Sequence, residues 1–130
     1  MNRSMVSKKD GFSLIEVLIA LTFLAIGLLA MASLQVTSVR GNFFSNSLMQ
    51  ATYVAQDRLE FLKNLPFDDP LLSPGDHPDD TKPISGINFN RAYRVGLNGN
   101  LKSVKYTVSW NDGANHSISF STFKSQSDRQ

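Results

Sequence analysis

The chain has 130 residues, no cysteine and a formal net charge of +2 at pH 7. This length limits the chain to one compact domain, and the lack of cysteine excludes internal disulfides and thiolate metal sites. The charge excess lies in residues 1–11, where Arg3, Lys8 and Lys9 outnumber Asp10, and charges balance in the remainder. With no basic patch to bind phosphates, we expect no nucleic-acid partner.

A predominantly apolar run extends from Phe12 to Leu34. As an α-helix rising about 1.5 Å per residue it would span about 35 Å, enough to cross a hydrocarbon core of about 30 Å. Lys8 and Lys9 precede the run, and the next basic residue is Arg40. The positive-inside rule therefore predicts a cytoplasmic N-terminus and an exported C-terminal part.

One carboxylate, Glu16, interrupts this run. A charge near the centre of a membrane helix costs about 2.5–3.5 kcal/mol on insertion scales, so an intramembrane acid indicates a function. A positive group at the same depth would relieve that cost. Cleavage between Gly11 and Phe12 would create an α-amino group one helical turn before Glu16, and a neighbouring copy displaced by a turn could place its amine against this carboxylate.

The residues KKDGFSLIEVLIAL, from Lys8 to Leu21, resemble the type III signal of type IV prepilins. The continuation to Gln35 is most similar to minor pilins of the PilV kind. The resemblance implies that a prepilin peptidase cleaves after Gly11 and N-methylates Phe12, and that Glu16 registers the incoming subunit against the filament. The chain lacks the first-helix proline and the C-terminal cysteine pair of many major pilins, which favours a minor subunit.

Three alternatives remain open for the N-terminal segment. A conventional signal peptide cleaved at Ala30-Met31-Ala32 would release an exported periplasmic binding protein, although the apolar region is long for such a signal and contains an acid. A plain single-span anchor would leave Glu16 unexplained. A pseudopilin of a type II secretion system would share the same leader chemistry.

The helical pattern continues after the apolar run until Pro66. Residues at spacings of three and four form one apolar stripe, which we expect to face a sheet: Phe44, Leu48, Ala51, Ala55, Leu59 and Leu62. A second stripe, which a lone subunit leaves partly uncovered, contains Phe43, Val54, Phe61 and Leu65.

All five prolines of the chain lie between Pro66 and Pro83, among five aspartates. This composition predicts an irregular connection over residues 66–90. Clustered carboxylates raise the question of calcium, for which Asp76, Asp79 and Asp80 are weak candidates. No EF-hand spacing is present, so a solvated acidic loop with no metal is the preferred interpretation.

Beyond the loop, apolar residues alternate as in half-buried antiparallel strands over residues 91–123. The residues expected on one side are Tyr93, Val95, Leu97, Val104, Tyr106, Val108, Trp110, Ile118 and Phe120. Asn98-Gly99 predicts one tight turn, and residues 111–115 predict the next. The predicted fold class is α+β and pilin-like, with a long N-terminal helix on a small antiparallel sheet.

The expected organisation is a leader at 1–11, a transmembrane helix half at 12–34, an amphipathic half at 35–65, the loop, the sheet and a polar tail at 124–130. No motif of a nucleophile elbow, zinc protease or phosphate loop is present, so we expect neither enzyme activity nor a cofactor. Stacking of DNA bases on Trp110 is a weaker alternative.

The sequence thus predicts a minor pilin with three kinds of protein partner: other pilins, the prepilin peptidase and the pilus assembly platform. It would reside in inner-membrane lipid and then in a surface filament.

Overall fold

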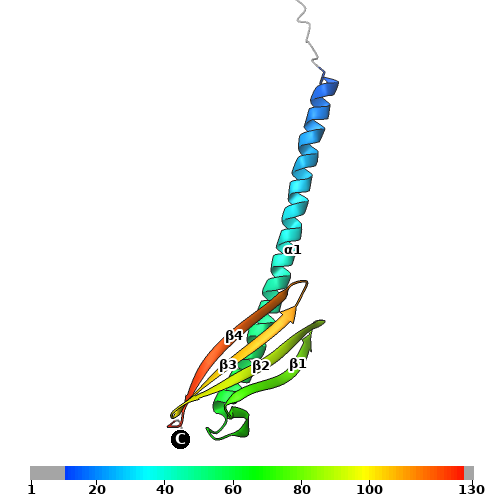
Figure 1. The fold of residues 1–130 in the computed structure, drawn as a ribbon. Coiled ribbons are helices and arrows are strands. Elements are labelled where there is room, and N and C mark those ends of the chain that lie inside the picture. The colour runs from blue at the N-terminus through cyan, green and yellow to red at the C-terminus, as the bar shows by residue number, and fades with distance from the viewer. Residues whose placement is uncertain (1–10, 128–130) are drawn as a thin grey trace, which may run out of the picture. The chain divides into compact units, whose positions relative to one another are not determined.

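The computed structural model describes residues 11–127 (Figure 1). The elements in order are the helix α1 (Leu14–Asn64), the short 3-10 helix η1 (Pro70–Leu72) and four β-strands. The chain divides into two units, Met1–Gly41 and Asn42–Gln130, and each is described by itself. Lys8 and Lys9 of the predicted leader lie outside the described residues.

The described part of the first unit is helical from Leu14 and is exposed throughout. No proline interrupts it, and the hydroxyl groups of Thr22 and Thr37 donate to the carbonyls of Leu18 and Ser33, four residues earlier in each case. These local bonds satisfy polar side chains without a partner from elsewhere in the chain. The segment is long and apolar enough to cross a membrane.

The second unit contains the end of α1, η1 and a four-stranded sheet with the order β1-β2-β3-β4. The strands are β1 (Gly75–Ile84), β2 (Ile87–Asn98), β3 (Leu101–Asn111) and β4 (Asn115–Ser125). All three pairings are antiparallel, and each strand pairs with the next along the chain. The predicted α+β architecture, a long helix packed on an antiparallel sheet, is confirmed.

The core lies between one face of the sheet and one stripe of α1. Ala51, Ala55, Leu59 and Leu62 of the predicted first stripe are buried, and Leu48 packs against them. The sheet contributes a buried set from its two interior strands, β2 and β3: Ile87, Phe89, Tyr93, Val95, Val104, Tyr106, Val108 and Trp110. Because two of the helix positions are alanine, the backbone of α1 can approach the large aromatic side chains of the sheet.

The predicted burial is wrong at the start of the first apolar stripe of α1 and near the end of β2. Phe44, at the start of the first stripe, is 39% exposed, and Leu97, near the end of β2, is 51% exposed. Val54 of the second stripe is buried, whereas Phe43 and Phe61 are largely exposed as expected. Leu97 pairs with Lys102 at the end of the β2–β3 ladder. The alternating pattern therefore predicts the face of a residue better than its burial.

The irregular connection predicted over residues 66–90 is wrong for most of its length. Strand β1 occupies Gly75–Ile84 and β2 begins at Ile87. Pro78 and Pro83 both lie in β1, which is an edge strand with a partner on one side only. An edge strand tolerates proline because a missing N–H that faces solvent removes no ladder bond.

The turns of the sheet are short. Ser85 and Gly86, which join β1 to β2, both have positive φ, at 50° and 81°. This backbone is that of a type I′ turn, whose twist matches a hairpin. The β2–β3 turn falls at Gly99 and Asn100, one residue later than the predicted centre, and the loop after Asn111 agrees with the sequence prediction.

Two lysines fix the segments that leave the sheet and the helix. Lys102 is buried, donates its Nζ to the carbonyl of Phe67 and lies 4.5 Å from the centre of that ring. Lys124 of β4 donates its Nζ to the carbonyl of Lys63 at 2.7 Å. The second bond satisfies one of the carbonyls left unpaired at the end of a helix.

Candidate functional site

The predicted processing segment lies immediately before α1. Gly11 and Phe12 are exposed and precede the first helical residue, Leu14. The carbonyl of Ser13 accepts hydrogen bonds from the N–H groups of Glu16 at 3.0 Å and Val17 at 3.2 Å, so the first turn closes on it. Within the described residues, the Gly11–Phe12 bond thus lies outside any regular element, exposed and just before a helix start, where a peptidase could reach it.

Among the residues that the structure describes, nothing sterically requires glycine at position 11. A Cβ built at this position would meet nothing within 4 Å. The demand for glycine predicted from the resemblance would therefore come from the enzyme that binds this peptide bond, because the chain itself leaves room for a side chain.

Glu16 lies in the first turn of α1 and is exposed. A carboxylate near a helix N-terminus gains about 0.3–1 kcal/mol from the helix dipole. That is less than the cost of about 2.5–3.5 kcal/mol for a charge at the centre of a membrane helix. The helix start offsets only part of the cost of Glu16, so an external positive partner is still needed if the residue is held in lipid.

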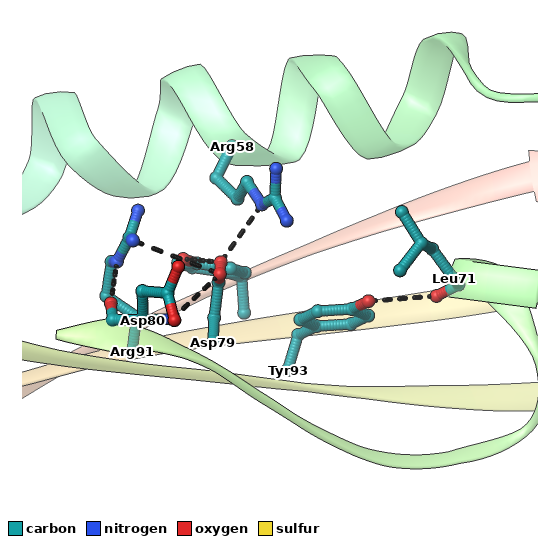
Figure 2. A network of polar contacts seen from close by, with 7 residues as sticks. Arg58, Leu71, Asp79, Asp80, Arg91 and Tyr93 are labelled. Carbon is teal, nitrogen blue, oxygen red and sulfur yellow. Dashed lines mark hydrogen bonds and ion pairs between the residues drawn. The ribbon is translucent and has the colours of Figure 1, made fainter.

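A second polar site lies in the second unit, called the head below, around Asp79 of β1 (Figure 2). Arg58 extends from α1 and donates its Nε to Oδ2 of Asp79 at 3.0 Å. The hydroxyl of Tyr106 donates to the same oxygen at 2.8 Å, and the N–H of Asp80 donates to Oδ1 at 2.9 Å. Nη2 of Arg91 lies 3.9 Å from Oδ1. One carboxylate thus connects the helix with three strands.

The electrostatics of this site follow from its burial. The side chain of Asp79 is 9% exposed. Burial raises the pKa of its carboxyl, but the hydrogen bonds from Tyr106 and Asp80, together with the charges of Arg58 and Arg91, outweigh burial and hold the pKa below its usual value. Burial and the same carboxylate raise the pKa of Tyr106, so Tyr106 remains a protonated donor. Asp79 is therefore ionised at neutral pH and fully partnered.

The three weak metal candidates do not converge on one point. Asp76 accepts two hydrogen bonds from the guanidinium of Arg94, whose contact lowers the carboxyl pKa. Asp79 is occupied by the contacts just described, and the backbone carbonyl of Asp80 accepts from Arg91. Residues 11–127 contain no group of three or more His, Asp or Glu side chains placed to hold a metal ion. The acidic residues of β1 serve as partners for arginine.

The sequence interpretation missed the network because it treated residues 66–90 as a loop. Its signal was nevertheless present: Ile84-Ser85-Gly86-Ile87 places a turn dipeptide between two apolar residues, as in a hairpin. Recognising that hairpin would have placed Arg91 opposite the aspartates of β1, but its regular register pairs Arg91 with Asp80, and only the irregular pairing between Asp79 and Lys82 makes Asp79 the register partner. Arg58 has no such signal, because its contact with Asp79 depends on how α1 packs on the sheet.

Residues 6–32 match the family model of the prokaryotic N-terminal methylation motif. This segment is therefore a prepilin-type signal, and the protein combines it with a pilin-like α+β architecture. The motif implies contact with a prepilin peptidase and with pilus components in general, and it indicates a structural subunit anchored in a membrane. No curated protein and no solved structure matches the chain.

Proposed function

We propose that this protein is a minor pilin, processed by a prepilin peptidase and then incorporated into, or used to prime, a type IV pilus. The match of residues 6–32 to the methylation motif carries this proposal. The exposed Gly11–Phe12 junction and the exposed apolar helix support it. In this function Gly11 and Phe12 flank the cleaved bond, Phe12 becomes N-methylated, and Lys8 and Lys9 keep the leader cytoplasmic.

The role of Glu16 follows from its place in the first turn of α1. Cleavage would put a positive amine on Phe12, within one helical turn of this carboxylate. Two subunits offset by about a turn, or about 5.4 Å, would align the amine of one with the carboxylate of the other. In a medium without water such a pair is favourable only when both charges are present, so it would fix the axial position of the incoming subunit.

The location would change in two stages. The subunit would first lie in the inner membrane with a periplasmic head, where it would meet the assembly platform, and would then move into the surface filament with other pilins. The exposed aromatic residues Phe43, Tyr53 and Phe61 would be covered there. A type II secretion pseudopilin shares the motif, and neighbouring genes for pili or for secretion would distinguish the two.

The N-terminal sequence and intact mass of the protein extracted from its native membrane test the proposal. We expect a chain that begins at N-methylated Phe12. A Gly11→Val chain should keep its leader, because the added side chain would crowd the peptidase site. A wild-type chain beginning at Ser33 would show a discarded signal peptide, and an uncut chain would remove the basis for the pilin assignment.

A further inference from the structure

Strands β1 and β4 form the two edges of the sheet (Figure 1). The residues of these two strands give the edges different chemistry. The β1 edge contains Pro78 and Pro83, and its pairing with β2 is irregular between Asp79 and Lys82. Proline removes a backbone donor, while irregular pairing and charge turn an edge away from other strands. The β1 edge is therefore protected against the addition of another strand.

The central part of the β4 edge has none of these protections, and Lys124, near the end of the strand, is bonded to the carbonyl of Lys63. Its segment Ser117–Phe123, SISFSTF, contains no proline, glycine or charged residue. In the part of the chain that the structure describes, β4 pairs with β3 alone, over a strand of 11 residues. An exposed edge whose segment Ser117–Phe123 has no charge, proline or glycine is a site for pairing with another chain.

The side chains of β4 define what kind of strand would fit. Ile118 and Phe120 point to the core side but are only partly buried, because β4 has no further neighbour to cover them. Ser117, Ser119 and Ser121 are exposed on the opposite face. An added strand with apolar residues on the core side and small polar residues on the other would complete the burial of Ile118 and Phe120.

A second copy of this chain does not fit that edge. If two β4 strands paired antiparallel with their core sides aligned, a twofold axis perpendicular to the sheet would relate the heads. The α1 segments at 42–64 would then run in opposite directions, whereas subunits anchored in one membrane must enter from the same side. If β4 paired with the β1 edge of another copy, the two α1 segments would run in the same direction. Pro78 and Pro83 disfavour this pairing, because each removes a backbone donor from the β1 edge.

We propose that the β4 edge, Asn115–Ser125, binds the first-strand edge of a different pilin-type subunit by β-strand addition. The inference rests on the proposed pilin function and names the partner in it. The partner strand lies antiparallel to β4, lacks prolines and places its helix on the same face of the extended sheet. Because the β1 edge is protected, the sheet can be extended only at β4. This subunit would therefore be the last one in a row of subunits joined by strand pairing.

Site-specific cross-linking of the full chain in its native host tests the inference. A photoreactive phenylalanine analogue replaces Ser119 on β4 or, as the matched control, Asn88, which is exposed on the interior strand β2. We expect a heterotypic adduct at Ser119 and none at Asn88. Mass spectrometry should identify the adduct as a protein that carries its own N-terminal methylation motif.

Charge at the edge should remove the adduct. The double variant Ser117→Lys and Ser121→Lys should lose cross-linking at Ser119, because lysine on an edge strand opposes pairing. An adduct with a second copy of this chain, an equal yield at Asn88, or no adduct at Ser119 would overturn the inference. The N-terminus of the same samples separates the two proposals: processing at Phe12 without a β4 adduct leaves the pilin function in place.

Discussion

At the residue scale, the carboxylates of Glu16 and Asp79 differ in how many hydrogen-bond donors the chain itself provides for them. Asp79 receives hydrogen bonds from Arg58, Tyr106 and a backbone N–H inside its own chain. Glu16 has only the dipole of the helix start, and no ion pair with it occurs among residues 11–127. A charge that its own fold stabilises is structural, whereas one that the fold leaves without a partner points to another molecule.

Replacement of Glu16 by alanine should leave insertion and cleavage intact and should block co-assembly with other pilins. Insertion should become easier, because a charged side chain is removed from the apolar segment. The amount of the chain in sheared pilus fractions, relative to the membrane pool, measures the effect. Glu60→Ala, at an exposed position of the same helix, is the matched control. Normal incorporation of the Glu16 variant would contradict the registration role.

Replacement of Asp79 by asparagine should destabilise the head at pH 7 by about 1.5–3 kcal/mol, the range for hydrogen bonds to charged groups. The pKa of Asp79 is lower in the folded chain than its usual value. Its stabilising contribution is therefore present above the unfolded pKa of about 3.9 and is lost as the pH falls through the folded pKa. The difference between wild type and Asp79→Asn should shrink over that acidic range.

Fluorescence of Trp110 provides the measurement, because it is the single tryptophan and is buried in the head. Denaturant unfolding of the full chain in detergent, at several pH values, gives the two stabilities. Asp76→Asn is the matched control, since its ion pair with Arg94 is exposed to solvent and such pairs contribute little to stability. An equal decrease in the free energy of unfolding of the two variants would show that the Asp79 network stabilises the head no more than an exposed ion pair does.

At the element scale, the helix and the last three strands could be predicted from their regular periodicity. Strand β1 was not predicted, because its prolines indicated a loop. The stripe from Leu48 to Leu62 and the alternation in β3 both report the face that meets the core. In β1, proline and aspartate dominate, so the alternation carries no apolar signal. That strand exists because β2 and α1 supply partners for it, above all Arg91 and Arg58 for Asp79, and tertiary contacts of this kind override local propensity.

Lys102 shows how one strand controls the segment after the helix. Its Nζ bonds the carbonyl of Phe67, so Lys102→Ala should leave that carbonyl unsatisfied and lower the free energy of unfolding by about 1–3 kcal/mol. Lys105→Ala, three positions along the same strand and exposed, should change it by less than about 0.5 kcal/mol. The same Trp110 unfolding assay compares them, and indistinguishable midpoints would mean that the Phe67 contact is dispensable.

At the scale of the whole molecule, the sequence predicted the class of fold and the prepilin-type signal because both depend on local patterns. A methylation motif and an apolar run are contiguous and can be recognised directly. The Asp79 network and the difference between the sheet edges depend on strand order, which no local pattern contains. The Asp79 network and the open β4 edge could therefore be recognised only from the three-dimensional structure.

Membrane anchoring by the first unit should be sensitive to charge at positions that would lie in lipid. Arginine at both Leu24 and Leu28 adds about 2.5–3.5 kcal/mol per residue to insertion and should shift the chain out of the carbonate-resistant membrane fraction. Arginine at both Met49 and Tyr53, which are exposed on the helix of the second unit, should leave that fraction unchanged. Retention of both variants alike would contradict a membrane span at residues 12–34.

The order of the sheet also has a consequence for how the head forms. Each strand pairs with the one made just before it, through connections of two or three residues, so loop closure is short at every step. Pairing of neighbouring strands keeps the sequence separation of contacts within the sheet short, whereas contacts of α1 with the sheet, such as Lys63 with Lys124, join residues 61 positions apart. The helix is made first, and the hairpins can then close one after another as the polypeptide is extended. The head needs no oxidative step to reach its native state, because the chain contains no cysteine.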